Sequence, residues 1–225
     1  MDMEDKEIIA IKVLDYVTDN SVIGLGTGST ANFFIKHLAN KIKNERLNIQ
    51  VVASSTVSEI EAQRNKLNLI GIDTLDTLDL YVDGADEITN DLNVLKGRGY
   101  DLVKEKILAQ SANKFIIIAD HSKRVNHIGE NYPIPIEVLK STWRLSKKIL
   151  DKFGQGSLRK NAAGDAYAIS SAGNYIFDYS FDEIPLRDLH EKILTTPGVI
   201  ETGIFYAITD YGLIVKNGHI EVFSK

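Results

Sequence analysis

The 225-residue sequence contains no cysteine, no apolar run long enough to cross a membrane and no stripe of basic side chains. Without cysteine there can be no disulfide, no thiolate metal site and no cysteine nucleophile. A formal net charge of −5 and the missing basic stripe argue against nucleic acid and acidic membrane surfaces as partners. The acidic opening MDMEDKEIIA lacks the apolar core of a signal peptide, which favours a cytoplasmic location.

Several common catalytic signatures are also missing. The five histidines show no metal-ligand spacing such as HExxH, and there is no G-x-S-x-G elbow of a hydrolase. Asp83, Asp86 and Glu87 could hold a magnesium ion, but nothing else in the chain indicates a di- or triphosphate to accompany it. We therefore expect neither a metal ion nor a cofactor.

The first 128 residues alternate between strand and helix patterns. Short apolar, β-prone segments are separated by longer segments with helical periodicity. This alternation is typical of a parallel, doubly wound sheet, so we predict a Rossmann-like α/β domain. The expected strands are 21–26, 49–55, 67–72, 78–83 and 114–120, and the expected helices are 7–17, 30–42, 56–66 and 102–112.

The pattern changes near Gly129 and predicts a second, smaller α+β domain. Its elements follow a βαββαβ-like order, which is ferredoxin-like. We place this domain at 129–206 and the first at 1–128 plus 207–225, with the tail 212–225 returning to the first sheet as a hairpin. The expected elements are a proline-containing edge strand at 132–138, a helix at 141–153 with Ser141 as its N-cap, a hairpin at 166–181 that turns at 172–174, a helix at 186–198 and a strand at 199–208.

Residues 24–30, GLGTGST, follow a predicted strand and open a predicted helix. The backbone N–H groups of such a turn could bind an anion, helped by the helix dipole. The segment matches neither the dinucleotide fingerprint nor the P-loop. The hydroxyls within 27–30 suit a phosphate monoester, but a tight turn with a capping hydroxyl explains them equally well. The next hydroxyl cluster, 54–56, is better explained as an ordinary helix cap.

Two further segments place carboxylates where catalysis could use them. The strand 78–83 runs into DGADE, and ligands bind at the carboxyl ends of strands in open α/β sheets. Glu105 falls among apolar residues on the helical wheel, and a carboxylate in such surroundings tends to have a raised pKa, as a general base requires. Each has an ordinary alternative: a solvated turn for DGADE, and a surface glutamate between lysines for Glu105.

GTGST, DGADE and a Lys-Gly loop with a glutamate nine residues after the lysine occur in this order. Together with ADHSKRV, PIPIEV and TPGVIETGIF, they resemble the ribose-5-phosphate isomerase A family nearly end to end. The resemblance implies an aldose–ketose isomerase that interconverts D-ribose 5-phosphate and D-ribulose 5-phosphate through an ene-diolate, without metal or cofactor. It further implies a role in the non-oxidative pentose phosphate pathway and a homodimer or homotetramer.

The resemblance also implies roles for individual residues. Glu105 matches the base that moves a proton between C2 and C1. Asp83 and Asp86 match the acids that hold sugar hydroxyls and assist ring opening, and Lys96 matches the lysine that stabilises developing oxyanion charge. The other substrate-binding residues implied in this way are Lys6, Thr27, Gly28, Ser29, Thr30, Gly84, Ala85, Gly97, Arg98, Gly99 and Lys123.

The loop after Lys96 departs from the small, glycine-rich loop of the family, because Arg98, Tyr100 and Asp101 occupy it. We expect Arg98 to point outward from the substrate. Gly97 and Gly99 are expected to set the backbone path, with Gly99 at a positive φ that a β-branched residue would not adopt.

Three other functions are compatible with parts of the pattern. A non-catalytic sugar-phosphate sensor would keep the phosphate loop, but it would usually carry a basic helix-turn-helix, and this chain has none. A nucleotide-dependent oxidoreductase is disfavoured by the failed G-x-G-x-x-G pattern. A related aminosugar-phosphate isomerase or deaminase would not explain the full order of motifs.

Overall fold

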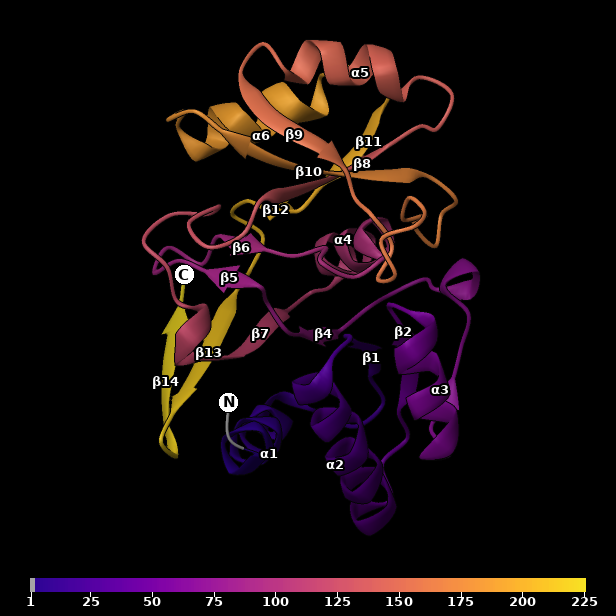
Figure 1. Cartoon of the computed structure of the whole chain (residues 1–225). Coiled ribbons are helices and arrows are strands. Elements are labelled where there is room, and N and C mark those ends of the chain that lie inside the picture. Colours follow the sequence, from indigo (N-terminus) through magenta and orange to yellow (C-terminus); the bar gives the residue numbers. More distant parts are fainter. Residues whose placement is uncertain (1–2) are drawn as a thin grey trace. The chain divides into compact units, whose positions relative to one another are not determined.

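The computed structural model describes residues 3–225, which form two compact units (Figure 1). Unit 1 consists of the chain up to Ala85, Lys104–Arg124 and Ile208–Lys225, and unit 2 consists of Asp86–Val103 and Val125–Ala207. Within the described residues, no helix combines the length and the apolar character needed to span a bilayer.

Unit 1 is built on a seven-stranded sheet with the order β14-β13-β7-β4-β1-β2-β3. All neighbours pair in parallel except the C-terminal hairpin of β13 and β14. The six parallel strands have the strand order of a Rossmann fold, which confirms the predicted fold class and the return of the tail to this sheet. The strands are β1 (Val22–Leu25), β2 (Gln50–Ala53), β3 (Asn68–Leu69), β4 (Leu80–Asp83), β7 (Phe115–Asp120), β13 (Tyr211–Lys216) and β14 (His219–Ser224).

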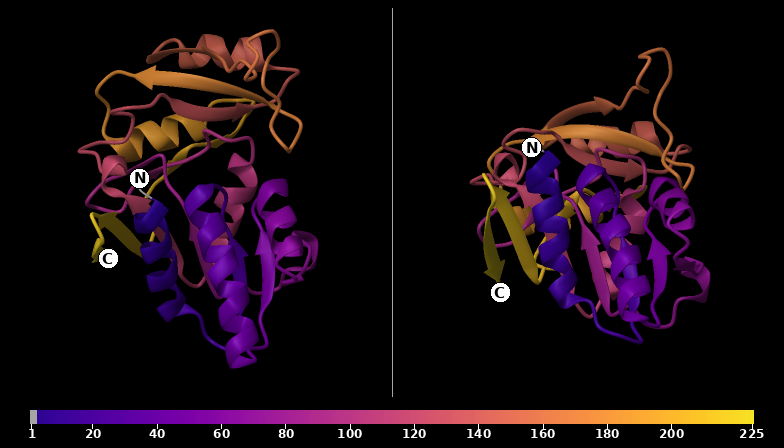
Figure 2. Two further views of the ribbon diagram at one scale, coloured as in Figure 1. Left: turned by 60° about the horizontal axis from the view of Figure 1, so that its bottom comes forward. Right: turned by 90° about the horizontal axis from the view of Figure 1, so that it is seen from below.

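Three helices of unit 1 lie side by side over one face of this sheet: α1 (Met3–Lys12), α2 (Ser29–Glu45) and α3 (Thr56–Arg64) (Figure 2). Their apolar faces bury side chains such as Phe34 and Leu38 against the central strands. Full burial of one such side chain is worth roughly 1.5–3 kcal/mol. The other helical segments are η1 (Val13–Tyr16), η2 (Ile72–Thr74), α4 (Leu102–Ser111) and η3 (His121–Lys123).

Unit 2 contains a four-stranded antiparallel sheet with the order β11-β8-β10-β9. Its elements follow one another as β8, α5, β9, β10, α6 and β11, which is the predicted ferredoxin-like βαββαβ order. Their bounds are β8 (Ile134–Val138), α5 (Trp143–Leu150), β9 (Gly154–Leu158), β10 (Tyr175–Phe181), α6 (Leu186–Leu194) and β11 (Val199–Thr202).

Three details of unit 2 differ from the sequence-based expectation. The proline-containing strand β8 lies inside the sheet and not at its edge, because it pairs with β10 on one side and β11 on the other. Pro135 is accommodated there because β11 pairs only with Ile136–Val138, and the Pro135 carbonyl accepts the Gly203 N–H at 2.7 Å. The residue that precedes α5 as its N-cap is Thr142 and not Ser141. The predicted hairpin at 166–181 is wrong in its first half, because residues 166–171 form only isolated bridges, and β10 pairs instead with β8 and with the unpredicted strand β9.

Glycines explain why β9 escapes detection in the sequence. Its sequence, GQGSL, lacks the β-branched residues that mark strands. A Cβ at Gly154 would lie 2.4 Å from a ring carbon of Phe181, and one at Gly156 would lie 2.3 Å from the Tyr179 ring. The aromatic side chains of β10 therefore occupy the space that side chains of β9 would need.

A small three-stranded sheet, β12-β6-β5, completes unit 2. It consists of β5 (Glu87–Ile88), β6 (Val94–Leu95) and β12 (Ile204–Phe205). The predicted strand 199–208 is split at Gly203, where a Cβ would lie only 2.4 Å from the Lys96 carbonyl oxygen. β6 pairs with β12 and β5 pairs with β6, so residues 86–103 belong to unit 2, whereas the sequence-based boundaries assigned them to the first domain.

Candidate functional site

The carboxyl ends of β1, β2 and β4 lie next to one another in unit 1. Leu25 is in register with both Ala53 and Val82, so the residues that follow these strands emerge together. The predicted glycine loop, the hydroxyl cluster at 54–56 and the first aspartate of DGADE therefore meet at one edge of the sheet, where open α/β sheets bind ligands.

Asp83 is completely buried at this edge, so the solvated-turn alternative is wrong for this residue. Its Oδ1 accepts hydrogen bonds from the N–H groups of Thr27 at 3.0 Å and Gly84 at 2.7 Å. Its Oδ2 accepts a hydrogen bond from the hydroxyl of Tyr81. A Cβ at Gly26 would lie 2.2 Å from Asp83 Oδ1, so a glycine at this position is what lets the loop approach the carboxylate.

Tyr81 is a site residue that the sequence reasoning missed. Its ring is fully buried and stacks on Phe115, with ring centroids 5.1 Å apart. Burial, followed by the negative charges of Asp83 and Glu105, raises the pKa of the Tyr81 hydroxyl well above its ordinary value, so the group remains a donor. Strand alternation could have identified it, because residues two apart in a strand point to the same face.

Hydroxyl groups connect the glycine loop to the start of α3. The Thr27 hydroxyl donates to Ser55 Oγ at 2.6 Å and lies 3.2 Å from Ser54 Oγ. Ser55 accepts the Ser58 N–H at 3.1 Å and completes a capping box, which confirms the predicted helix cap. Both the N–H and the hydroxyl of Thr27 thus bind other protein groups.

The rest of the glycine loop opens the helix α2. Gly28 precedes the helix with φ of 112°, a left-handed conformation that favours glycine, and gives it no side-chain cap. Ser29 is exposed and Thr30 is buried in the first turn. N–H groups in the first turn of a helix have no intrahelical partner and point out of its N-terminus, so residues 28–30 have the geometry of an anion site.

Glu105 lies in the first turn of α4 and is only 7% exposed, so the surface alternative is wrong. The adjacent Lys106 is also buried, whereas Ile107 is 48% exposed. The helix therefore buries two charged side chains together with apolar ones such as Leu102 and Leu108, which an ordinary amphipathic helix would not do. The negative charge of Glu105 contributes to the raised pKa of Tyr81, whose hydroxyl donates to Asp83. Both carboxylates of unit 1 therefore act on the same tyrosine.

In unit 2, Lys96 follows β6 and is 5% exposed. Its N–H donates to the Gly203 carbonyl at 2.9 Å, and its Nζ lies 5.9 Å from the centroid of the Phe205 ring. Asp86 begins the same unit; its N–H donates to the Leu95 carbonyl at 2.9 Å, which fixes the aspartate beside β6.

The loop after Lys96 follows the predicted path only in part. Gly97 has φ of 93°, and a Cβ there would lie 3.0 Å from Leu102 Cδ1, so glycine is required. Gly99 is not among the residues with positive φ and has open space around its Cα, so the expectation for this glycine was wrong. Arg98 is exposed and its guanidinium stacks over the Tyr132 ring at 4.0 Å.

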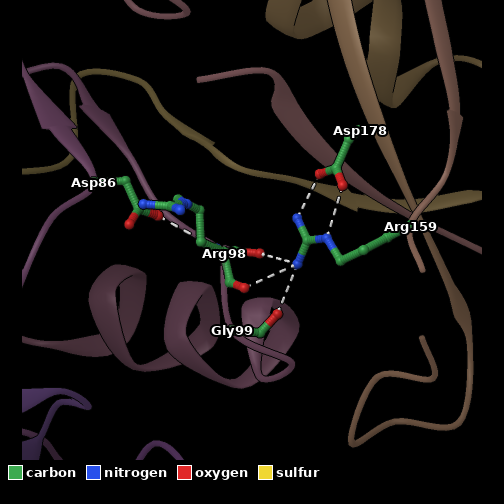
Figure 3. Close-up of polar contacts among 6 residues, drawn as sticks. Asp86, Arg98, Gly99, Arg159 and Asp178 are labelled. Atoms are coloured by element: carbon green, nitrogen blue, oxygen red, sulfur yellow. Dashed lines mark hydrogen bonds and ion pairs between the residues drawn. The ribbon is translucent and has the colours of Figure 1, made fainter. Parts of the chain in front are cut away.

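Arg159 is a second residue that the sequence reasoning missed. Its guanidinium faces the carbonyl groups of this loop on one side and Asp178 on the other (Figure 3). Arg159 is distant in sequence from the loop and has no recognisable motif around it, so no sequence signal could have identified this contact.

Glu87, the last carboxylate of DGADE, binds a different part of the chain from Asp83. It is completely buried and accepts N–H groups from Gly129 at 2.6 Å, Asn131 at 2.6 Å and Tyr132 at 3.0 Å. These bonds hold the loop that leads to β8. Among residues 3–225, no three histidine, aspartate or glutamate side chains converge in a way that could hold a metal ion.

The remaining predicted residues lie at the ends of unit 1 elements. Gly84 and Ala85 are half-buried directly after β4. Lys6 is half-buried in the first turn of α1, and Lys123 is half-buried at the end of η3, just after β7. These positions do not by themselves assign a ligand to either lysine.

Comparison with known proteins gives a consistent result over the whole chain. Residues 50–218 match the family model described as ribose 5-phosphate isomerase A (phosphoriboisomerase A). The chain is 34% identical to ribose-5-phosphate isomerase A of Staphylococcus haemolyticus over 228 residues, covering 99% of both chains. It is 38% identical to the enzyme of that name from Pyrococcus abyssi over 226 residues, covering 99% of this chain and 98% of the other.

Solved structures give the same picture. The ribose 5-phosphate isomerase A of Methanocaldococcus jannaschii superposes with a TM-score of 0.92 at 32% identity, covering 99% of each chain. A D-ribose-5-phosphate isomerase in complex with phospho-erythronic acid superposes with a TM-score of 0.94 at 35% identity, covering both chains completely.

Proposed function

Since this chain belongs to the ribose 5-phosphate isomerase A family and is an isomerase of ribose 5-phosphate and ribulose 5-phosphate, we propose that Glu105 is the base that transfers the proton. The observation that carries this proposal is the burial of Glu105 in unit 1, where its charge acts on the same tyrosine that binds Asp83. A carboxylate removed from water is a stronger base than one on the surface, and a positioned base typically contributes about 10²–10⁴ in rate.

The proposed reaction begins with the ring form of the sugar. Asp83 and Asp86 hold its hydroxyl groups and exchange the proton that opens the ring to the C1 aldehyde. Three donors to Asp83 support this role, because they fix the direction of its carboxylate before the substrate arrives. Asp86 follows Asp83 by only three residues in the chain, which supports a shared task.

In the next step Glu105 removes the proton from C2, and the electron pair of that bond forms the C1–C2 double bond of the ene-diolate. The carbonyl oxygen at C1 gains a proton and the hydroxyl at C2 loses one, while Glu105 returns its proton to C1. We assign Lys96 to the oxygen that carries the developing negative charge. An ammonium that is 5% exposed supports this role, because charge stabilisation is stronger where water is excluded.

We assign the phosphate group of the substrate to the N-terminus of α2. Gly28, Ser29 and Thr30 would bind it through backbone N–H and hydroxyl groups, with Lys6 and Lys123 as candidate cations. Thr27 would contribute indirectly, because its N–H and hydroxyl already bind Asp83 and Ser55. Gly84, Ala85 and the loop 97–99 remain candidates for contacts with the sugar.

We further propose that the reaction needs no metal ion and belongs to the non-oxidative pentose phosphate pathway. A phosphate monoester carries a charge of about −1.5 to −2 at pH 7, so a sugar phosphate does not readily cross a membrane and stays inside the cell. An enzyme that acts on this substrate is expected in the cytoplasm. A homodimer or homotetramer is proposed from the family alone, and light scattering of the purified protein tests it.

The replacement Glu105→Gln tests the assignment of the base. Wild-type enzyme in D₂O should place solvent deuterium at C2 of ribose 5-phosphate, whereas Glu105→Gln should bind the substrate but incorporate deuterium about 10²–10⁴ times more slowly. The matched control is Glu59→Gln, which alters an exposed glutamate on α3 and should leave exchange unchanged. Near-normal exchange in Glu105→Gln would assign the base elsewhere, and tight binding without turnover by the wild type would favour a sensor.

A further inference from the structure

The loop that follows Lys96 has an unusual set of backbone partners within unit 2. Arg159, the residue after β9, donates from Nη1 to the carbonyl oxygens of Gly97 at 2.8 Å, Arg98 at 3.1 Å and Gly99 at 2.9 Å. Three successive carbonyls thus converge on one nitrogen of a guanidinium group (Figure 3).

The guanidinium is itself held from the other side. Its Nε and Nη2 donate to the two oxygens of Asp178 at 2.9 Å and 2.5 Å, in a two-pronged arrangement that only arginine can make. Asp178 lies in the middle of β10 and is in register with Ser157, so its carboxylate comes from the centre of the four-stranded sheet. The Arg159 side chain is only 12% exposed, so solvent does not weaken these bonds as it weakens those of a surface pair.

The direction of the three carbonyl groups determines the direction of the N–H groups in the same peptide units. In a trans peptide the N–H points away from the C=O of the same peptide unit. The N–H groups of Arg98, Gly99 and Tyr100 are therefore turned away from Arg159. One of them is seen to do so, since the Arg98 N–H donates to Asp86 Oδ2 at 3.3 Å.

We propose that the Arg159–Asp178 pair is a positioning device for the reaction, which sets the orientation of the loop that joins Lys96 to α4. It turns the N–H groups of three peptide units away from Arg159, with that of Arg98 directed to Asp86, and it fixes the backbone that follows Lys96. This inference rests on the proposed roles of Lys96 and Asp86. Arg159 is a positioning residue, because its guanidinium is engaged by Asp178 and by the three carbonyls of the loop.

Three variants separate this role from simple stabilisation. Arg159→Met keeps the length of the side chain but removes every donor, and we expect kcat to fall on the order of 10²-fold, as for a misplacement of about 1 Å. Arg159→Lys keeps the charge and should recover part of that loss. Arg187→Met is the matched control, because Arg187 also pairs with a carboxylate in unit 2 but is 69% exposed, and its kcat should not change.

Two measurements do not depend on stability. Guanidinium ion at millimolar concentration should restore activity to Arg159→Ala, and methylammonium should not, because only the planar ion can bridge Asp178 and the carbonyls. Amide hydrogen exchange should become faster in the loop 97–100 of Arg159→Met, whereas the core of β7 should remain protected as in the wild type.

The possible results lead to different conclusions. A folded Arg159→Met with kcat within about twofold of the wild type would overturn the inference. If Arg159→Met does not fold, Arg159→Lys decides: a reduced kcat at an unchanged melting temperature supports the role, and wild-type kcat refutes it. Wild-type protein without any isomerase activity would instead refute the proposed function, while the exchange measurement would still test whether Arg159 orders the loop.

Discussion

Replacement of Tyr81 by phenylalanine removes the hydroxyl that donates to the buried Asp83 and that also bonds to Ser54. The phenylalanine ring should keep its stack on Phe115, because only the hydroxyl is lost. Asp83 keeps the N–H groups of Thr27 and Gly84 on Oδ1 but loses the donor on Oδ2. The change is therefore a nearly isolated test of what the tyrosine hydroxyl contributes.

The magnitude follows from the burial of both partners. The loss of the Tyr81 donor from a buried carboxylate costs about 2 kcal/mol, so the free energy of unfolding should fall by that amount in urea titrations. If the hydroxyl also fixes Asp83 for ring opening, kcat should fall as well, with roughly 30-fold as the upper limit for that energy. Tyr167→Phe is the control, because the Tyr167 side chain is 46% exposed and both quantities should stay unchanged.

The stability difference between wild type and Tyr81→Phe should also depend on pH. The folded protein raises the pKa of Tyr81 above its ordinary value of 10.0, chiefly through burial. The contribution of the protonated hydroxyl is therefore fully present below about pH 10, and it is lost as the pH rises through the folded value. A difference that is constant from neutral pH to 9 and then shrinks supports this account. A loss of less than about 0.5 kcal/mol at neutral pH would refute the reasoning, because the bond would then contribute nothing.

The other predictions concern the phosphate loop, the lysine loop and metals. Thr30→Ala should weaken binding of ribose 5-phosphate more than binding of ribose. Equal effects on both sugars in calorimetry would show that residues 28–30 do not bind the phosphate and have only a structural role. Arg98→Gly should change turnover less than severalfold, since Arg98 is exposed and stacks on Tyr132; a large rise in KM would make Arg98 a substrate ligand. Gly97→Ala should lower kcat, because Gly97 has a φ of 93° that alanine adopts poorly, whereas Gly99→Ala should be tolerated. Steady-state kinetics of the two variants measures this difference. Exhaustive chelation should leave full activity, and loss that magnesium or zinc restores would contradict a metal-free reaction.

The sequence predicts the larger features of the fold because they depend on local periodicity. The alternation of apolar strands and helices in the first half is enough to indicate the parallel sheet, and the pattern of residues 212–225 indicates the final hairpin. The strand β9 could not be predicted, because its glycines are explained only by the aromatic side chains of β10. For a similar reason the position of β8 inside its sheet could not be predicted, because it depends on pairing with β10 and β11, which come later in the sequence.

The candidate site shows the same division. The spacing of motifs identifies Glu105, Asp83, Asp86 and Lys96, and the family resemblance assigns their roles. Burial excludes the surface alternatives for Asp83 and Glu105, and burial is a property of the folded chain that the helical wheel only suggests. The three carbonyl contacts of Arg159 join segments that lie far apart in the sequence, so they depend on the tertiary fold and leave no local pattern.

The order of segments in unit 1 has a consequence for how the protein is made. Strand β13 pairs with β7, yet it is encoded after the whole of unit 2, so the ribosome delivers it only after all segments of unit 2. Until then β7 has an open edge whose backbone groups can pair with another nascent chain. Unit 2, whose segments are all synthesised earlier, can close first. The vulnerable interval in biogenesis therefore falls late, and a ribosome stalled before Tyr211 should yield an intermediate that needs chaperones more than the complete protein does.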